Sequence, residues 1–157
     1  MPAFRYAGLA SHLADEVRAT LRSPQYGHPA HREPARGYGP CRHCLRTFRV
    51  GEEDRLLFTY QPFAPGALPA PGPVFIHADG CPRYDALDFP PEFRGLPLVV
   101  EGYSADARLV AQEWVREASP EEVIDRVFRD PGTAFVHLRN AEAGCFMARV
   151  ERCFVCD

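Results

Sequence analysis

Hydrophobic and polar residues alternate along much of this chain with the two-residue period of β-strands. Over residues 55–63 the alternation places Leu56, Phe58 and Tyr60 on one face and Leu57, Thr59 and Gln61 on the other. Shorter stretches of the same kind predict strands at residues 74–78, 97–103, 107–115, 134–139 and 145–154. A hairpin around Ser104-Ala105-Asp106 is expected to join the strands 97–103 and 107–115.

In two other segments the apolar residues recur with the spacing of a helix. Residues 3–22 predict a short strand followed by a helix, in which Ser11 is the expected N-cap and Asp15 and Glu16 lie in the first turn. The second helix begins with Ser119-Pro120-Glu121-Glu122, a capping box with proline at the first helical position. Its buried face is predicted to consist of Val123, Ile124, Val127 and Phe128.

These elements predict an α+β fold with a mostly antiparallel sheet of about six strands and two helices. The chain has 157 residues, which suits one domain spanning 1–157. Within it we expect a strand-helix lead-in over 1–22, a Pro/Gly-rich loop over 23–40 and a main α+β body over 41–157.

Charge and composition exclude several classes of function. The net charge of -3 provides no general attraction to nucleic acid, so nucleic acid is an unlikely partner. All eighteen basic residues are arginine, which excludes a Schiff-base lysine and the lysine of a P-loop. The apolar runs are too short to span a membrane, and the first residues do not form a leader. We therefore expect a cytoplasmic protein whose cysteines are thiols or metal ligands.

The six cysteines include two Cys-x-x-Cys pairs, Cys41–Cys44 and Cys153–Cys156. This spacing allows both sulfurs of a turn to reach one zinc ion about 2.3 Å away. The first pair follows Gly37-Tyr38-Gly39-Pro40, where a turn is easily formed. A redox pair of the thioredoxin type would need a helix beginning at the first cysteine, and the residues after Cys44 are a poor helix start.

A zinc site at the first pair needs two further ligands. Cys153 and Cys156 would complete an all-cysteine site, although Cys156 is the penultimate residue. His77 and Cys81 would instead complete a site of three cysteines and one histidine. An extended strand would hold those two about 13 Å apart, so this second set requires a turn at Asp79-Gly80. The residues alone leave both sets open.

A second polar group gathers near the last predicted hairpin, where His137, Arg139, Asn140 and Cys145 form a candidate binding pocket. His137 and Arg139 would share one face of a strand, and Cys145 would return close to Asn140 after the turn. A thiol beside a histidine and an amide is also the combination that enzymes with a cysteine nucleophile use. The common hydrolase, dinucleotide-binding, P-loop and metalloprotease motifs are absent from the sequence.

From residue 38 onward the chain resembles a bacterial family known as domain of unknown function 1203. The resemblance lies in the following segments: Pro40-Cys41-Arg42-His43-Cys44-Leu45, Tyr60-Gln61-Pro62-Phe63, Gly72-Pro73-Val74-Phe75-Ile76-His77 with Cys81, His137-Leu138-Arg139-Asn140-Ala141, and Gly144-Cys145-Phe146. It implies a single-domain, non-membrane protein and brings no activity, substrate or cofactor. Because its pattern includes His77 and Cys81 but not the C-terminal pair, the resemblance favours Cys41, Cys44, His77 and Cys81 as the zinc ligands.

The sequence therefore favours a ligand- or partner-binding module with a Cys/His zinc site. The expected partner is an unidentified small molecule or protein. The alternative is a thiol-dependent enzyme that uses Cys145, or a redox pair at Cys41 and Cys44.

Overall fold

The computed structural model describes residues 3–37, 39–63 and 71–154 of the chain. Within these residues the fold is α+β, with two α-helices, a six-stranded sheet and a three-stranded sheet. All strand pairs are antiparallel. The chain divides into two compact units, unit 1 (Met1–Ala7 and Asp85–Asp157) and unit 2 (Gly8–Tyr84). The predicted fold class is confirmed, although the strands form two sheets rather than one.

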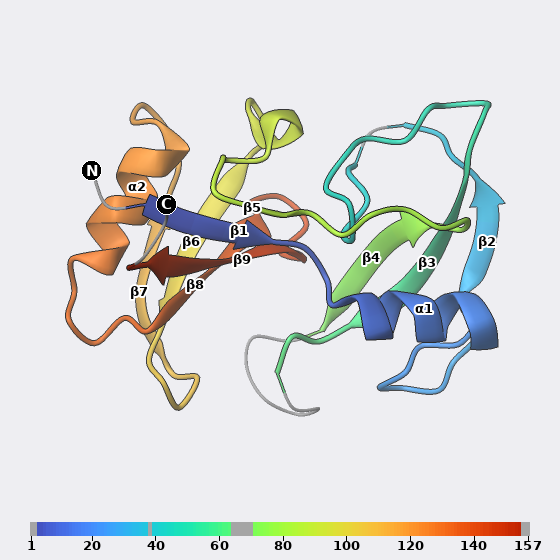
Figure 1. The fold of residues 1–157 in the computed structure, drawn as a ribbon, viewed down its shortest axis with the longest axis horizontal. Coiled ribbons are helices and arrows are strands. Elements are labelled where there is room, and N and C mark those ends of the chain that lie inside the picture. The colour runs from blue at the N-terminus through green and yellow to red at the C-terminus, as the bar shows by residue number, and fades with distance from the viewer. Residues whose placement is uncertain (1–2, 38, 64–70, 155–157) are drawn as a thin grey trace. The chain divides into compact units, whose positions relative to one another are not determined.

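The sheet of unit 1 has the strand order β5-β1-β9-β8-β6-β7 (Figure 1). The strands β6 and β7 form the expected hairpin, and β8 and β9 form a second one. The first strand of the chain, β1, pairs with the last, β9. The bounds are β1 (Ala3–Ala7), β5 (Asp85–Ala86), β6 (Leu98–Tyr103), β7 (Leu109–Trp114), β8 (Phe135–Asn140) and β9 (Phe146–Cys153). A short 3-10 helix, η1 (Pro91–Phe93), lies between β5 and β6.

Helix α2 (Pro120–Phe128) contacts β6, β7 and β8 of this sheet. The predicted cap is confirmed, because the Ser119 side chain accepts a hydrogen bond from the Glu122 backbone N–H. The expected apolar face is buried, with Ile124 fully enclosed. Gly102 on β6 allows the close approach, since a Cβ there would lie 2.6 Å from a methyl of Val127. The alternation of side chains along strands thus assigns Gly102 and its neighbour Val136 to the face that α2 covers.

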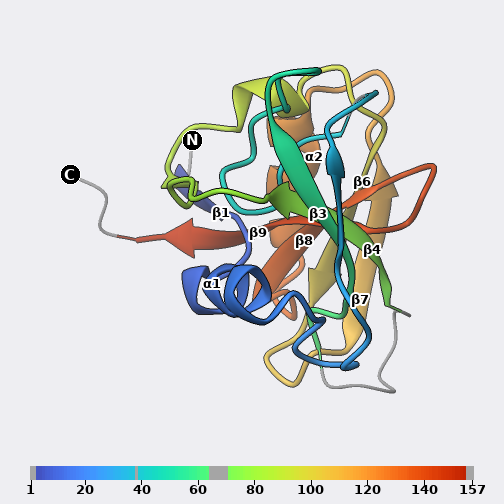
Figure 2. The same cartoon turned by 90° about the vertical axis from the view of Figure 1, so that its right-hand side faces the viewer.

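Unit 2 contains helix α1 (Ser11–Thr20) and the sheet β2-β3-β4, whose strands lie side by side in Figure 2. The strands are β2 (His31–Pro34), β3 (Asp54–Tyr60) and β4 (Gly72–His77). The alternation expected along β3 is present at Leu56 and Phe58, which are buried, and at Leu57, which is half-buried. It does not continue to the end of the predicted strand, because Tyr60 is half-buried and Gln61 is buried. Both prolines of this sheet, Pro34 and Pro73, lie on edge strands, where a missing N–H is tolerated.

Two local predictions in unit 2 are wrong. Ser11 does not cap α1: Ala10 is the N-cap, and Ser11 is the first helical residue, so no acidic residue falls in the first turn. The segment 23–40 is not only loop, because its residues His31–Pro34 form β2. Those four residues contain no alternating apolar pattern, and only their hydrogen bonds to β3 make them a strand.

No helix within the described residues is long and apolar enough to cross a membrane. The prediction of one domain over 1–157 stays a prediction.

Candidate metal centre

The Cys41–Cys44 pair lies in a tight turn of unit 2. The turn is closed by hydrogen bonds from the Leu45 N–H to the Cys41 carbonyl and from the Cys41 N–H to the Arg46 carbonyl. Leu45 has a φ of 61°, the left-handed conformation that reverses the chain after the second cysteine. Both cysteines are buried, and their sulfurs point to the same place because the turn is so short.

His77 is the last residue of β4, and Cys81 follows it after a turn. The turn begins where the Ala78 N–H donates to the Asp54 carbonyl. As a result the chain folds back, and one ligand atom from each of Cys41, Cys44, His77 and Cys81 lies within 4.8 Å of the others. The turn that the His77–Cys81 alternative required is therefore present. The three residues Cys41, Cys44 and His77 are buried, and Cys81 is partly exposed.

The distances in this cluster suit tetrahedral zinc. Zinc bonds of about 2.3 Å to sulfur and about 2.0–2.1 Å to nitrogen hold two sulfurs about 3.8 Å apart, and a sulfur and a nitrogen about 3.5 Å apart. Here Sγ of Cys41 lies 3.9 Å from Sγ of Cys81, and Sγ of Cys44 lies 3.4 Å from Nδ1 of His77. Backbone N–H groups of His43 and His77 also donate to Sγ of Cys41, at 3.4 and 3.3 Å. The cluster is therefore compatible with a metal ion.

His77 is held in one orientation by its other ring nitrogen. Nε2 lies 2.9 Å from a carboxylate oxygen of Glu53, and the ring of Phe48 packs 4.5 Å from the imidazole centre to centre. A carboxylate behind a ligating histidine fixes the ring and raises its basicity. Sequence analysis did not identify Glu53, since only the pairing of β3 with β4 brings it beside His77.

Cys81 has its own polar surroundings. Its sulfur lies 3.1 Å from Nη2 of Arg18 on α1 and 3.2 Å from Nδ1 of His43. The other nitrogen of His43 lies 3.0 Å from Oγ of Ser11, so Ser11 orients the ring rather than capping the helix. Sequence analysis missed these three residues as well. The one signal for His43 was its position inside the Cys-x-x-Cys turn.

The crowding of thiols and imidazole perturbs their protonation. Burial opposes any charge in the cluster, yet hydrogen bonds from Cys44, Cys81 and His77 lower the pKa of Cys41. Burial likewise opposes charge on His77, but the neighbouring thiols and Glu53 raise its pKa to about 10. Hydrogen bonds from Cys41 and Cys44, with burial, raise the pKa of Cys81. These shifts favour a Cys41 thiolate beside a protonated His77 in the metal-free cluster.

The residues of the second predicted site, in unit 1, mostly contact neighbouring groups rather than one another. Arg139 pairs with the buried Glu101, with 2.5 Å between Nε and Oε1, and donates from Nη1 to the Gly144 carbonyl. Asn140 accepts hydrogen bonds at Oδ1 from Glu142 and Ala143 and so shapes the turn. The Asn140 N–H donates to the Cys145 carbonyl, which confirms that the two residues are close.

His137 and Cys145 are buried in the same region. The imidazole packs among the rings of Tyr103, Phe135 and Phe146 at centroid distances of 5.1–5.3 Å. Burial, followed by the charges of Arg139 and Arg149, lowers the pKa of His137 to about 3, so the ring is neutral at ordinary pH. Cys145 is 4% exposed, which leaves little access for a substrate of a thiol enzyme. The assignment of these residues to a binding site stays a prediction.

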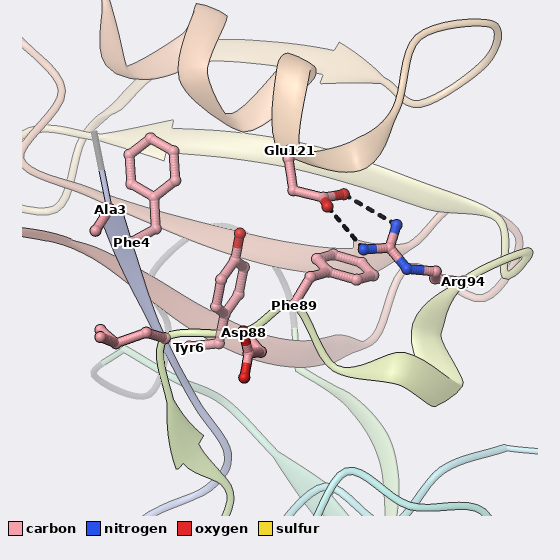
Figure 3. A pocket seen from close by; sticks show the side chains of 8 residues that line it. Ala3, Phe4, Tyr6, Asp88, Phe89, Arg94 and Glu121 are labelled. Atoms are coloured by element: carbon pink, nitrogen blue, oxygen red, sulfur yellow. Dashed lines mark hydrogen bonds and ion pairs between the residues drawn. The ribbon is translucent and has the colours of Figure 1, made fainter. Parts of the chain in front are cut away.

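Unit 1 also has a pocket of about 260 Å³ that sequence analysis did not find. Figure 3 shows the aromatic side chains of Phe4, Tyr6 and Phe89 beside an ion pair between Arg94 and Glu121. The pair is bidentate, with N–O distances of 3.1 and 2.7 Å. The lining comes from β1, the segment after β5, Arg94 just after η1, and α2, so no local motif marks it.

The expectation that the cysteines are thiols or metal ligands is wrong for Cys153, which is disulfide-bonded, and Cys156 lies outside the described residues. The fold and the cluster together define a small α+β protein with a buried group of three cysteines and one histidine that is compatible with a metal ion. The family "Protein of unknown function (DUF1203)" matches residues 38–152, and the chain belongs to this family. No curated protein and no solved structure matches the chain.

Proposed function

We propose that this protein is a binding module in which unit 2 holds one structural zinc ion through Cys41, Cys44, His77 and Cys81. The observation that supports this most directly is the convergence of four ligand atoms, from two separate chain segments, within 4.8 Å of one another. Three thiols and one imidazole are a donor set that favours zinc, whereas magnesium and calcium bind oxygen ligands.

A structural role is favoured by the number of ligands. Four protein ligands fill a tetrahedral site, whereas catalytic zinc keeps one position for water or substrate. The ion would link the Cys41–Cys44 turn to the end of β4 and to Cys81. Glu53 would act behind His77 as its carboxylate partner.

The experiment is elemental analysis of the untagged full-length protein, purified without added metal. We expect about one zinc per chain, and X-ray absorption should show three sulfur neighbours and one nitrogen neighbour at about 2.3 and 2.0–2.1 Å. The thiols of Cys41, Cys44 and Cys81 should resist alkylation until a chelator is added. Metal-free protein that also fails to bind added zinc would contradict the proposal.

Matched variants separate the two ligand sets that the sequence left open. His77→Ala and Cys44→Ser should lose the zinc, while Cys153→Ser and the buried Cys145→Ser should retain it. Loss of zinc in Cys153→Ser with retention in His77→Ala would instead support the all-cysteine site. All four variants keep the rest of the chain unchanged, so zinc content can be compared directly.

The pocket in unit 1 favours a small, planar, apolar group as the ligand of the module. Phe4, Tyr6 and Phe89 line the pocket but are largely buried, so the parts that stay exposed suit edge contacts with another ring. Arg94 and Glu121 neutralise each other, so they form one wall of the pocket without requiring a charged ligand. Indole is a suitable probe, with binding followed by NMR shifts of the aromatic protons of Tyr6 and Phe89.

The expected result is a saturable shift in the wild type that weakens in Phe89→Leu. The exposed residue Leu109 lies outside the lining, so Leu109→Ala serves as the control. Absence of any saturable shift up to the solubility limit of indole would contradict this pocket as the ligand site.

A further inference from the structure

One ligand of the cluster differs from the other three in access and in neighbours. Cys41, Cys44 and His77 are 0%, 3% and 7% exposed, whereas Cys81 is partly open to solvent. Its sulfur is also the one approached by a guanidinium and by an imidazole, Arg18 at 3.1 Å and His43 at 3.2 Å. Arg18 also donates from Nε to the His77 carbonyl at 3.0 Å, so this guanidinium contacts two of the four residues.

We propose that Cys81, deprotonated by its bond to zinc, is the reactive sulfur of the site, and that a hydroperoxide oxidises it to form a disulfide with Cys41 and release the zinc. This inference rests on the zinc site proposed above. It adds a modification site and an oxidant class, the hydroperoxides, to a site otherwise regarded as structural.

The first step is a two-electron transfer at sulfur. The Cys81 thiolate attacks the distal oxygen of the hydroperoxide, the S–O bond forms and the O–O bond breaks. The products are the Cys81 sulfenic acid and the hydroxide or alkoxide of the leaving oxygen. Negative charge develops on that leaving oxygen, beside the donors of Arg18 and His43. Donors placed where charge develops lower the barrier to this step.

The second step needs a nearby thiolate, and Cys41 supplies it. Its sulfur lies 3.9 Å from that of Cys81, so a movement of about 1.9 Å reaches the S–S bond length of about 2.0 Å. Cys41 attacks the sulfenic sulfur, hydroxide leaves, and a disulfide forms. Two of the four ligands are then consumed. His77 and Cys44 alone cannot retain a tetrahedral ion, so the zinc is released.

The test treats the zinc-loaded full-length protein with hydrogen peroxide in small equivalents. A zinc-sensitive dye follows release, and peptide mass spectrometry identifies the oxidised cysteines. We expect one zinc released per peroxide consumed, together with a Cys41–Cys81 disulfide, and recovery of zinc binding after a thiol reductant is added. First oxidation at Cys145, or zinc retained through the first equivalent of peroxide, would overturn the inference.

Variants outside the ligand set test the role of the polar neighbours. Arg18→Gln and His43→Gln should keep about one zinc per chain but release it at least about tenfold more slowly under peroxide. Matched controls are Arg22→Gln and His12→Gln, which change the same residue types on the surface of unit 2 without contacting the cluster. Equal rates in all four variants would overturn the role of Arg18 and His43.

Failure of this inference is distinguishable from failure of the zinc site. A protein that carries one zinc per chain but resists peroxide contradicts only the reactivity of Cys81. A protein without zinc contradicts the proposed function itself, and this is established before any oxidant is added.

Discussion

Nε2 of His77 and Oε2 of Glu53 lie 2.9 Å apart, and this contact orients the imidazole so that Nδ1 faces Cys44. The carboxylate is itself held by the Arg49 N–H, which donates to the same oxygen at 2.8 Å. The residues that position a ligand are therefore part of the metal centre, although none of them would touch the ion.

Replacing Glu53 tests this arrangement. Glu53→Gln should weaken zinc affinity by about 10–100-fold, because the amide holds and polarises the imidazole less strongly than a carboxylate does. Competition with a chelator of known affinity provides the measurement. The neighbouring Glu52 contacts Arg49 at the surface and not His77, so Glu52→Gln is the control. Equal affinities in the two variants would show that the contact does not support the site.

The close packing around Gly8 predicts that a larger residue at this position would disturb the metal centre. A Cβ at this position would lie 2.3 Å from the carbonyl oxygen of His43 and 2.8 Å from that of Arg42. These are backbone atoms of the Cys41–Cys44 turn, so Gly8→Ala must displace the turn. We expect weaker zinc binding and a loss of about 1–3 kcal/mol in the stability of unit 2.

Gly80 provides the control for Gly8. No atom of the described residues lies within 4 Å of a Cβ built there, although the residue adjoins Cys81. Zinc affinity from chelator competition and stability from urea unfolding of the zinc-loaded protein should both be close to the wild-type values in Gly80→Ala. If Gly8→Ala behaves like Gly80→Ala, the turn is more adaptable than its packing indicates.

The buried ion pair of unit 1 predicts a large loss of stability. Glu101 and Arg139 are each 5% exposed, and Tyr103 and Gln112 also donate to the Glu101 carboxylate. Glu101→Gln leaves the arginine charge buried without its counter-ion, which should cost about 3–5 kcal/mol. Urea unfolding followed by the fluorescence of Trp114, the single tryptophan, reports on this unit.

An exposed ion pair in the same unit serves as the comparison. Arg5 and Asp85 are separated by 2.6 Å, but both side chains are more than one third exposed. Asp85→Asn should therefore change stability by no more than about 1 kcal/mol. A loss in Asp85→Asn as large as that in Glu101→Gln would mean that burial does not set the cost.

His137 predicts a pH dependence of stability. Its folded pKa, lowered to about 3 by burial and by Arg139 and Arg149, lies below the unfolded value of about 6.5. As the pH falls through about 6.5, His137 therefore becomes protonated in the unfolded chain but stays neutral in the folded one. Stability is unaffected by this group at pH 8 and should be about 1.4 kcal/mol lower at pH 5.5.

The measurement is urea unfolding followed by Trp114 fluorescence at both pH values, in the wild type and in His137→Gln. Other groups titrate equally in both proteins, so the difference between their pH dependences isolates the histidine. We expect the variant to lack the decrease of about 1.4 kcal/mol. Identical pH dependences would mean that His137 is protonated in the folded protein.

Much of the secondary structure could be predicted because its causes are local. The alternation around Leu56 and Phe58 and the capping box at Ser119 each depend on residues within one turn or one strand. The strand His31–Pro34 could not be predicted in this way, since its residues show no pattern and only hydrogen bonds to β3 define it. Ser11 shows the opposite case, in which a residue with good capping chemistry instead contacts a distant histidine.

The chemistry of this protein was determined by the sequence itself: the six cysteines, the Cys-x-x-Cys spacing, the absence of lysine and the family to which the chain belongs. The family resemblance favoured His77 and Cys81 as the remaining members of the cluster, but only the tertiary structure brings them beside Cys41 and Cys44. The turn after β4 brings Cys81 back to His77, and the pairing of β3 with β4 brings Glu53 behind it. Spacing along a chain limits only short-range geometry, whereas contacts between distant segments are set by the packing of the whole fold.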